Sequence, residues 1–334
     1  MNFTIVGAGA IGGVLGSALD AAGHDVVFVE AADAHRQAIA ANGLRVTGLT
    51  ARLCRAPVLA PDEVGNLAGC VVLAVKSHHT PTALAMLKGR VAPDGCVISL
   101  QNGLNEYQIA DAFGAERTVG AYLTFGGYLA EPGVIHHAGA GSFKLGELDG
   151  ADSVRLRSLV AAFSTLQPVE ATDNIIGYLW TKMALGAVYY GTAVLDRDVP
   201  DIYADARARE ALGQGAREVA EVAVLNAVRL EQSDGFDPRA FYDGDDDAIA
   251  ASWDAQRSYW ARHSGNARTG VWRDLAIHQR RTEGSAHLGA VIEAARRSGV
   301  KTPMLDRIMQ CVSEIEAGSR ALGWANLEFL LAAR

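Results

Sequence analysis

The chain begins with a glycine pattern set between two apolar runs. Gly7, Gly9 and Gly12 form a GxGxxG motif after residues 3–6, and a helical pattern connects this motif to the second apolar run, residues 26–29. A strand, a glycine turn, a helix and a second strand make up the β-α-β unit that binds dinucleotides. The first glycine permits a tight turn, the second lets the backbone approach a pyrophosphate, and the third lets helix and strand pack closely. The sequence therefore predicts a dinucleotide site, with the phosphates at a helix N-terminus.

An acidic residue, Glu30, ends the second apolar run. A carboxylate at that place accepts hydrogen bonds from the ribose 2′-hydroxyl of NAD and repels the 2′-phosphate of NADP. The three residues that follow bring no cation, although His35 and Arg36 remain able to turn toward a phosphate. We therefore expect NAD as the cofactor, with NADP as the less favoured alternative. Ala10 and Ile11, inside the glycine motif, are expected to belong to the same cofactor site.

Composition excludes several classes of protein. The 334 residues are 49% hydrophobic and 20% charged, which suits a globular chain of two domains. A net charge of −8 without a basic run argues against nucleic-acid or anionic-membrane partners. The four cysteines are scattered, which predicts reduced, mostly buried thiols and no metal site.

The chain shows no targeting or membrane signal. No apolar run approaches the roughly 20 residues that a membrane span needs. The first strand pattern starts within a residue or two of Met1, which leaves no room for a signal peptide. We expect a cytoplasmic, soluble protein that acts on a small-molecule substrate.

The first half alternates strand-like and helix-like segments. Apolar runs at 69–77 and 96–105 flank a helical stretch, and residues 116–148 have the pattern of strands with glycine turns. A helix over 154–166 and a strand around Val169 complete this half. The pattern predicts an α/β fold, a Rossmann-type doubly wound sheet with an antiparallel extension, as a dinucleotide-binding domain over 1–173.

The second half changes to long helical stretches from about Asn174 onward. These stretches are residues 176–194, 204–230, 272–298 and 303–317. Between them, residues 233–254 are acidic and rich in turn formers, and we interpret them as a surface excursion. Its Asp245, Asp246 and Asp247 are expected to be solvated or to cap a helix rather than bind a metal. The sequence predicts a C-terminal all-helical substrate and catalytic domain over 174–334, whose apolar helices leave a homodimer possible.

Four polar residues stand where such a fold places chemistry. Lys76 follows the third apolar strand and Asn102 follows the next, at the sheet edge that binds ligands. Lys182 lies on the first helix of the second half, and Glu283 lies on a later predicted helix. Each residue also has an interpretation without a function. The lysines are then solvated surface residues, Asn102 belongs to an Asn-Gly turn, and Glu283 forms a surface ion pair. Asp274, nine residues before Glu283 on the same predicted helix, is expected to point to the opposite side.

The order and the sequence motifs of these segments resemble those of the ketopantoate reductase family. The matching elements are the GAGAIGG start, the lysine of AVKS, the QNGL turn, the W-x-K helix and the D-x5-R-R-T-E segment. The resemblance covers nearly the whole chain, apart from residues 233–262, which are longer than usual.

The resemblance implies a dehydrogenase or reductase acting on a CH–OH or C=O group. It makes Lys182 the proton donor to the substrate carbonyl, and Glu283 the residue that holds this lysine or the substrate. It places Asn102, counted among the catalytic residues, and Lys76 on the nicotinamide and ribose side. Hydride addition to a carbonyl develops an alkoxide, which a lysine ammonium can stabilise and protonate.

Three side chains of the pantoate-type pattern are missing. That pattern carries asparagines four and eight residues after the lysine and a serine ahead of the glutamate, where this chain has Gly186, Tyr190 and Gly270. A site that loses its polar partners is expected to recognise ketopantoate poorly or not at all. A glycine inside a helix costs roughly 1 kcal/mol relative to alanine, which suggests that space is needed on that face. The alternative is that these glycines mark close helix packing. Separately, Thr269 is expected to restore a hydroxyl near the position of Gly270 if the register of this loop slips by one residue.

The leading hypothesis is an NAD-dependent oxidoreductase that interconverts a 2-oxo acid or related carbonyl with its hydroxy form. The substrate is expected to be bulkier and less polar than ketopantoate, with an aromatic one as a candidate. One alternative is an authentic ketopantoate reductase of pantothenate biosynthesis. The other is a non-catalytic NAD-binding sensor, against which the retained Lys182 and Glu283 argue.

Overall fold

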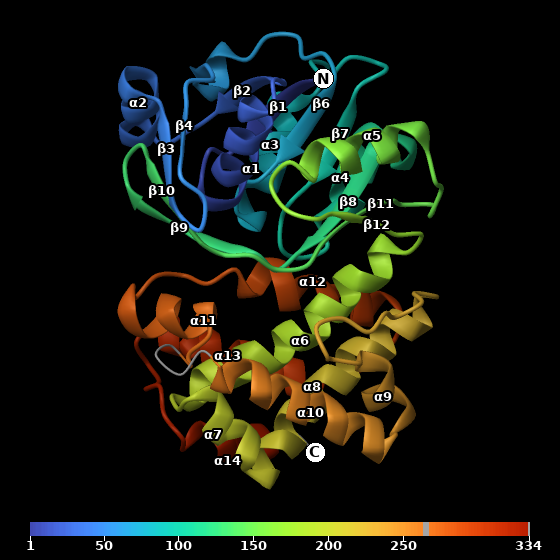
Figure 1. Ribbon diagram of the computed structural model, residues 1–334. Helices are drawn as coiled ribbons and strands as arrows, with labels where there is room; N and C mark the ends of the chain where they lie inside the picture. The colour runs from blue at the N-terminus through green and yellow to red at the C-terminus, as the bar shows by residue number, and fades with distance from the viewer. Residues whose placement is uncertain (263–266, 333–334) are drawn as a thin grey trace. The chain divides into compact units, whose positions relative to one another are not determined.

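Short apolar strands form the main sheet of the first half. A computed structural model describes residues 1–262 and 267–332. Within these, the strands of the main sheet are β1 Asn2–Val6, β2 Asp25–Val29, β5 Val58–Leu59, β6 Cys70–Leu73, β7 Cys96–Ser99, β8 Thr118–Leu123, β11 Phe143–Glu147 and β12 Glu170–Ala171. They lie in the order β12-β11-β8-β7-β6-β1-β2-β5 (Figure 1), parallel except where β11 pairs antiparallel with β8. The predicted doubly wound sheet with an antiparallel extension is confirmed.

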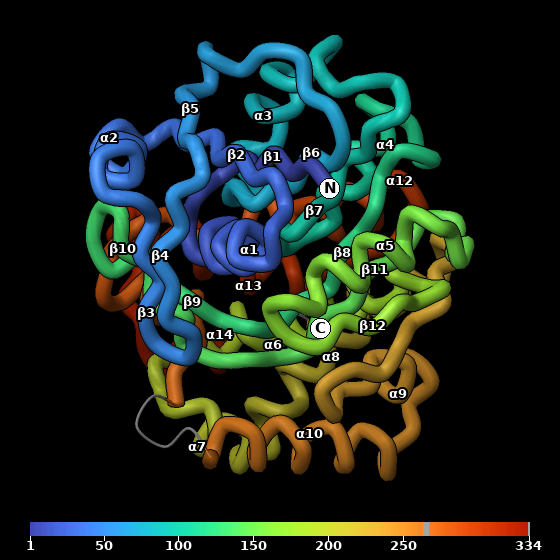
Figure 2. The backbone as a smooth tube through the Cα atoms, turned by 45° about the horizontal axis from the view of Figure 1, so that its top comes forward, coloured from blue at the N-terminus to red at the C-terminus, as the bar shows by residue number. Residues whose placement is uncertain are grey.

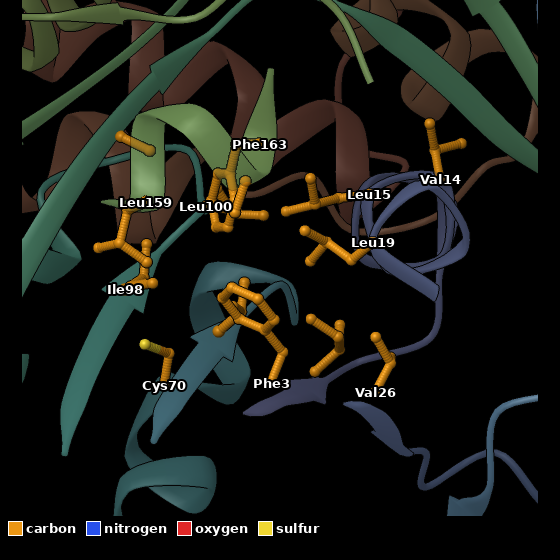
Figure 3. Packing of buried hydrophobic residues seen from close by; sticks show 14 of the residues in the cluster. Phe3, Val14, Leu15, Leu19, Val26, Cys70, Ile98, Leu100, Leu159 and Phe163 are labelled. Atoms are coloured by element: carbon orange, nitrogen blue, oxygen red, sulfur yellow. The ribbon is translucent and has the colours of Figure 1, made fainter. Parts of the chain in front are cut away.

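Helices cover both faces of this sheet because successive strand residues point to opposite sides. The helices are α1 Ala10–Ala21, α2 Asp33–Asn42, α3 Thr80–Leu87, α4 Asn105–Phe113 and α5 Val154–Phe163. Phe3 of β1 packs in one core cluster with Leu15 of α1 and Phe163 of α5 (Figure 3). Val6 of the same strand belongs to a second cluster with Leu87 of α3. Figure 2 accordingly shows α3 and α4 on one side of β1, β6 and β7, and α1 and α5 on the other.

A second sheet of four described strands was not predicted. Its strands are β3 Leu44–Gly48, β4 Arg52–Cys54, β9 Gly126–Glu131 and β10 Val134–Gly139, in the order β4-β3-β10-β9. The strands predicted over 116–148 therefore divide between two sheets, because β10 pairs with β3 and β9 pairs with β10 instead of extending the main sheet. The small sheet packs on α1, where a Cβ added to Gly13 would lie 2.3 Å from Cδ1 of the buried Ile135.

The described elements of the second half are helices, as predicted. They are α6 Ile175–Leu195, α7 Val199–Ala204, α8 Ala206–Leu225, α9 Pro238–Asp243, α10 Asp246–Ala261, α11 Gly270–Trp272, α12 Gly284–Arg297, α13 Pro303–Glu316 and α14 Asn326–Leu331. By its contacts the chain divides into two units, Met1–Ile175 and Ile176–Arg334. Among the described helices, none combines the length and the apolar character needed to cross a bilayer.

The continuous helix predicted over 272–298 is wrong. A π-helical turn over Arg273–Ile277 follows α11, Gln279 has a positive φ of 47°, and α12 starts only at Gly284. The inference that Asp274 points away from Glu283 on a shared helix therefore fails. Asp274 instead accepts hydrogen bonds from Nε and Nη2 of Arg280, at 2.9 and 2.7 Å.

The acidic segment is more than a surface excursion. It contains α9 and the first half of α10, and Asp245 caps α10 by accepting a hydrogen bond from the Ala248 N–H at 3.0 Å. Trp253 and Trp260 of α10 are buried, and the Tyr189 hydroxyl on α6 donates to Oε1 of Gln256 at 3.1 Å. The capping role expected for this aspartate cluster is thus present, on a helix that packs against α6.

A buried carboxylate joins two helices of the second unit. Glu218 of α8 is 1% exposed and accepts hydrogen bonds from the backbone N–H groups of Met304 and Leu305, at 3.0 and 2.9 Å. Burial raises the pKa of Glu218 to about 6, although these two N–H groups act in the opposite direction. Glu218 therefore provides the hydrogen-bond acceptor for two N–H groups in the first turn of α13, where Thr302 makes no side-chain cap bond.

Replacing Glu218 with alanine should lower the free energy of unfolding by about 3 kcal/mol, because two buried N–H groups lose their acceptor. Chemical denaturation followed by circular dichroism measures this change. The control is Arg217→Ala on the same helix, where the side chain is exposed and the expected change is below about 0.5 kcal/mol. Equal unfolding midpoints for the two variants would contradict the assignment.

Candidate active site

The glycine loop lies between β1 and α1 and has the geometry of a phosphate cradle. Gly7 has a φ of 99° and donates from its N–H to the Val29 carbonyl at 2.8 Å. A Cβ on Gly12 would stand 2.1 Å from the Gly7 carbonyl oxygen, so only glycine fits there. A Cβ on Gly9 would meet no atom within 4 Å, and Gly9 gives α1 no side-chain cap. The first turn of α1, with Ala10 and Ile11 half-buried, is thus able to receive an anion.

Glu30 stands beside this loop at the end of β2. Its carboxylate accepts hydrogen bonds from the N–H of Ala8 at 3.0 Å and from the N–H of Ala32 at 2.8 Å. These bonds orient the carboxylate and leave lone pairs for a ribose hydroxyl. His35 is 4% exposed and already bonded to two backbone groups, and Arg36 pairs with Asp33 at 2.8 Å. Turning either side chain toward a 2′-phosphate would break these interactions.

The loops after β6 and β7 are joined to each other. Lys76 and Asn102 are both exposed on these loops. The Asn102 carbonyl accepts from the Ser77 hydroxyl and from Nδ2 of Asn105, the latter at 2.7 Å. Gln101 adds a bond from its Nε2 to the Val75 carbonyl at 2.9 Å. Lys76 and Asn102 are predicted from the sequence, whereas the three supporting side chains are not, because only their closeness along the chain to these two residues points to them.

In the second unit, α6 carries three of the predicted residues at intervals of four. Lys182 and Gly186 are half-buried, and Tyr190 is 3% exposed. A Cβ on Gly186 would find only Cε of Met183, at 3.9 Å. By contrast, a Cβ on Gly191 would collide with Cδ2 of Leu212 at 2.3 Å. Close packing thus accounts for Gly191 and not for Gly186, where a Cβ has room.

Tyr190 belongs to a polar group at the start of α12. Its hydroxyl lies 3.2 Å from Nδ1 of His287, with the two rings nearly perpendicular. Glu283 is the residue just before α12, and its carbonyl accepts from the His287 N–H at 2.9 Å. Burial raises the pKa of Tyr190, and the negative charge of Glu283 raises it further. The phenol is therefore neutral at physiological pH. His287 was not predicted as a site residue, although it stands four residues after Glu283.

In the segment before α12, Thr269 is buried and Gly270 is exposed. Thr269 is 2% exposed, and its hydroxyl caps α11 by accepting from the Trp272 N–H at 3.2 Å. Gly270 is exposed, and a Cβ there would meet only Nη2 of Arg273, at 3.9 Å. A substrate contact through the Thr269 hydroxyl would have to compete with this cap, whereas Gly270 leaves space.

Arg268 anchors this segment. Its guanidinium pairs with Asp196 at 2.8 Å and with Asp198 at 2.6 Å, both just beyond α6. Nε1 of Trp272 donates to the same Asp196 at 2.7 Å. The position of Gly270 is thus tied to the C-terminal end of the helix that carries Lys182.

A parallel sheet with a glycine loop at the carboxyl end of β1 defines a nucleotide-binding α/β protein. Two family models match this chain: "Ketopantoate reductase PanE/ApbA" over residues 3–150, and its C-terminal part over residues 174–316. The chain belongs to the ketopantoate reductase family. It is accordingly an NAD(P)-dependent oxidoreductase that acts on a keto or hydroxy group, as the sequence resemblance implied.

Relatives match over nearly the whole chain. The 2-dehydropantoate 2-reductase of Halobacterium salinarum is 28% identical, over 93% of this chain and 98% of its own length. The solved structure of a PanE/ApbA family ketopantoate reductase from Ralstonia eutropha is 25% identical, with a TM-score of 0.77, over 96% of this chain and 99% of its own. A D-mandelate dehydrogenase solved with NADH and anilino(oxo)acetate shares the fold, at 22% identity and a TM-score of 0.80, over 96% and 99% of the two chains.

Proposed function

We propose that this protein is an NAD-dependent oxidoreductase that interconverts a 2-oxo acid bulkier than ketopantoate with its 2-hydroxy acid. The open space at Gly186, one turn beyond Lys182 on α6, is the observation that carries this proposal. Pantoate-type members place an amide there, whereas here the side of the helix near the proton donor is free to receive a larger group. Tyr190 supplies an aromatic wall one turn further on.

In the proposed reaction, reduction adds a hydride to the carbonyl carbon and a proton to its oxygen. The nicotinamide, when bound, supplies or accepts the hydride. Lys182 gives the proton to the developing alkoxide, and in the reverse direction takes it from the hydroxyl. Glu283 orients the lysine or the substrate, and Asn102 and Lys76 hold the nicotinamide and ribose. The glycine loop binds the pyrophosphate at the start of α1.

The substrate class rests on shape and polarity together. Gly186 and Gly270 carry no side chain where the pantoate-type pattern has an asparagine and a serine, so these two positions offer room and no polar partner for a small hydroxylated acid. The D-mandelate dehydrogenase with the same fold acts on a 2-hydroxy acid that carries a phenyl ring. Aromatic and branched 2-oxo acids are therefore the substrates to test first.

Glu30→Arg should change the cofactor preference. The wild-type carboxylate repels a 2′-phosphate, whereas a guanidinium attracts one, so the ratio of kcat/KM for NADPH to that for NADH should rise about 100-fold. Steady-state kinetics with both cofactors measures this ratio. The control is Glu63→Arg, the same substitution at an exposed acidic residue of another loop. An unchanged ratio in Glu30→Arg would overturn the assignment of NAD.

An authentic ketopantoate reductase is the second candidate, because the curated relatives are 2-dehydropantoate 2-reductases. Cofactor absorbance at 340 nm decides between the two. NADH and NADPH are each paired with ketopantoate and with a panel of aliphatic and aromatic 2-oxo acids. NADH-linked turnover of a bulky acid supports the proposal, and efficient NADPH-linked turnover of ketopantoate overturns it.

A further inference from the structure

Both backbone groups of one loop residue are held by side chains. Ala8 lies between Gly7 and Gly9 of the dinucleotide loop and is fully buried. Its N–H donates to Oε2 of Glu30 at 3.0 Å, and its carbonyl oxygen lies 2.9 Å from Nε2 of His35. The orientation of the two peptide groups that flank Ala8 is therefore set from outside the loop.

The hydrogen bonds of His35 define its tautomer. The Gly133 N–H donates to Nδ1 of His35 at 2.9 Å, so Nδ1 carries a lone pair. The ring proton accordingly sits on Nε2, which donates to the Ala8 carbonyl. Gly133 lies in the turn between β9 and β10, so one imidazole links the small sheet to the dinucleotide loop.

We propose that His35 is a positioning residue for the nicotinamide cofactor, acting through the Ala8 carbonyl. Without this donor, the buried carbonyl has no partner and the peptide between Ala8 and Gly9 is free to rotate. The N–H of Gly9 belongs to that peptide, so its direction toward the pyrophosphate depends on His35. Glu30 and His35 thus act on the same residue, one at its N–H and the other at its carbonyl.

Two amide substitutions separate the two bonds of the imidazole. In His35→Gln the side-chain amide reaches the position of Nε2, so the donor to Ala8 is kept. In His35→Asn the shorter amide reaches only the position of Nδ1, so the acceptor for Gly133 is kept and the donor to Ala8 is lost. Direct titration of the purified protein with NADH and NADPH, followed by nicotinamide fluorescence, measures binding without any substrate.

The dissociation constant of the preferred cofactor should rise about tenfold in His35→Asn and stay within about twofold in His35→Gln. At saturating cofactor, kcat should remain at the wild-type value in both variants, because the reacting groups are untouched. The thermal midpoint of His35→Gln should fall nevertheless, since it loses the bond to Gly133. A merely structural role would lower stability in the two variants without separating their cofactor affinities.

The matched control is His24→Asn in the same unit. The imidazole of His24 is hydrogen-bonded to the N-terminal amine and lies outside the dinucleotide loop. Wild-type cofactor affinity in His35→Asn, or equal weakening in both amide variants, would overturn the proposal. Should His35→Asn fail to fold, His35→Gln still tests the proposal, because a tenfold loss of affinity in that folded variant refutes the role of the Ala8 bond. The inference needs only the nicotinamide cofactor of the family, and it does not depend on which hydroxy acid is turned over.

Discussion

Replacing Lys182 with alanine is expected to lower kcat about 1000-fold, while the dissociation constant of NADH stays within twofold of wild type. The loss is large because one ammonium both stabilises the developing alkoxide and protonates it. Cofactor affinity is spared because the glycine loop and Glu30 belong to the other unit of the chain. Steady-state absorbance at 340 nm with saturating substrate and a fluorescence titration give the two quantities.

Two further lysine variants make this result specific. Lys182→Arg keeps the positive charge, yet a guanidinium does not give up its proton near neutral pH, so most of the activity should still be lost. Lys301→Ala removes an exposed lysine from the same unit and should leave kcat unchanged. Substantial turnover in Lys182→Ala would mean that another group donates the proton, and the assignment of α6 as the catalytic helix would fall.

Gly186→Leu is expected to decrease activity and increase stability at the same time. The new side chain fills the space beside Lys182, so kcat/KM for an aromatic 2-oxo acid should fall about 100-fold, the effect of roughly 3 kcal/mol of lost complementarity. The protein should become more stable by about 0.5–1 kcal/mol, because leucine is a better helix former than glycine and the Cβ at this position would meet only Cε of Met183, at 3.9 Å. Steady-state kinetics and chemical denaturation measure the two changes.

Gly191→Leu is the matched control for Gly186→Leu. It lies on the same helix, but its side chain would enter the volume of Leu212, so it should destabilise the protein. Gly186→Asn provides the opposite test of specificity, because it returns an amide to the position and should raise activity toward ketopantoate. If Gly186→Leu turned over bulky acids as well as the wild type, the space at Gly186 would not be a substrate pocket.

Strong local patterns predicted the elements that they encode. The first β-α-β unit, the strands that precede Lys76 and Asn102, and α6 follow from apolar periodicity and glycine spacing alone. The structure contains the β-α-β unit and α6 within one or two residues of the predicted bounds, whereas β6 and β7 end four and six residues before the predicted runs do. A helix cap could also be predicted from the sequence, because the hydrogen bond between the Asp245 carboxylate and the Ala248 N–H joins residues that are only three apart. The family followed from motifs that are contiguous in sequence.

Long-range partners could not be predicted in this way. The break between Ile277 and Gly284 depends on the positive φ of Gln279, which no local signal demands. The partners of His35 lie 27 and 98 residues away along the chain, and Tyr190 meets His287 across 97 residues. Single-sequence patterns report on neighbours along the chain, so the second sheet and the partners of both histidines became visible only in three dimensions.

The small sheet has a consequence for how the first unit acquires its binding ability. Its strands β3 and β10 pair in parallel although about ninety residues separate them, and the residue just before β10, Gly133, is the one that bonds to His35. Such distant closure is entropically costly and comes late in folding. A fragment that ends after β5 would keep the glycine motif and Glu30 but lack the turn that holds His35. We therefore expect the glycine motif to gain full affinity only as the last third of its own unit is added, so that a nascent chain cannot capture the dinucleotide early.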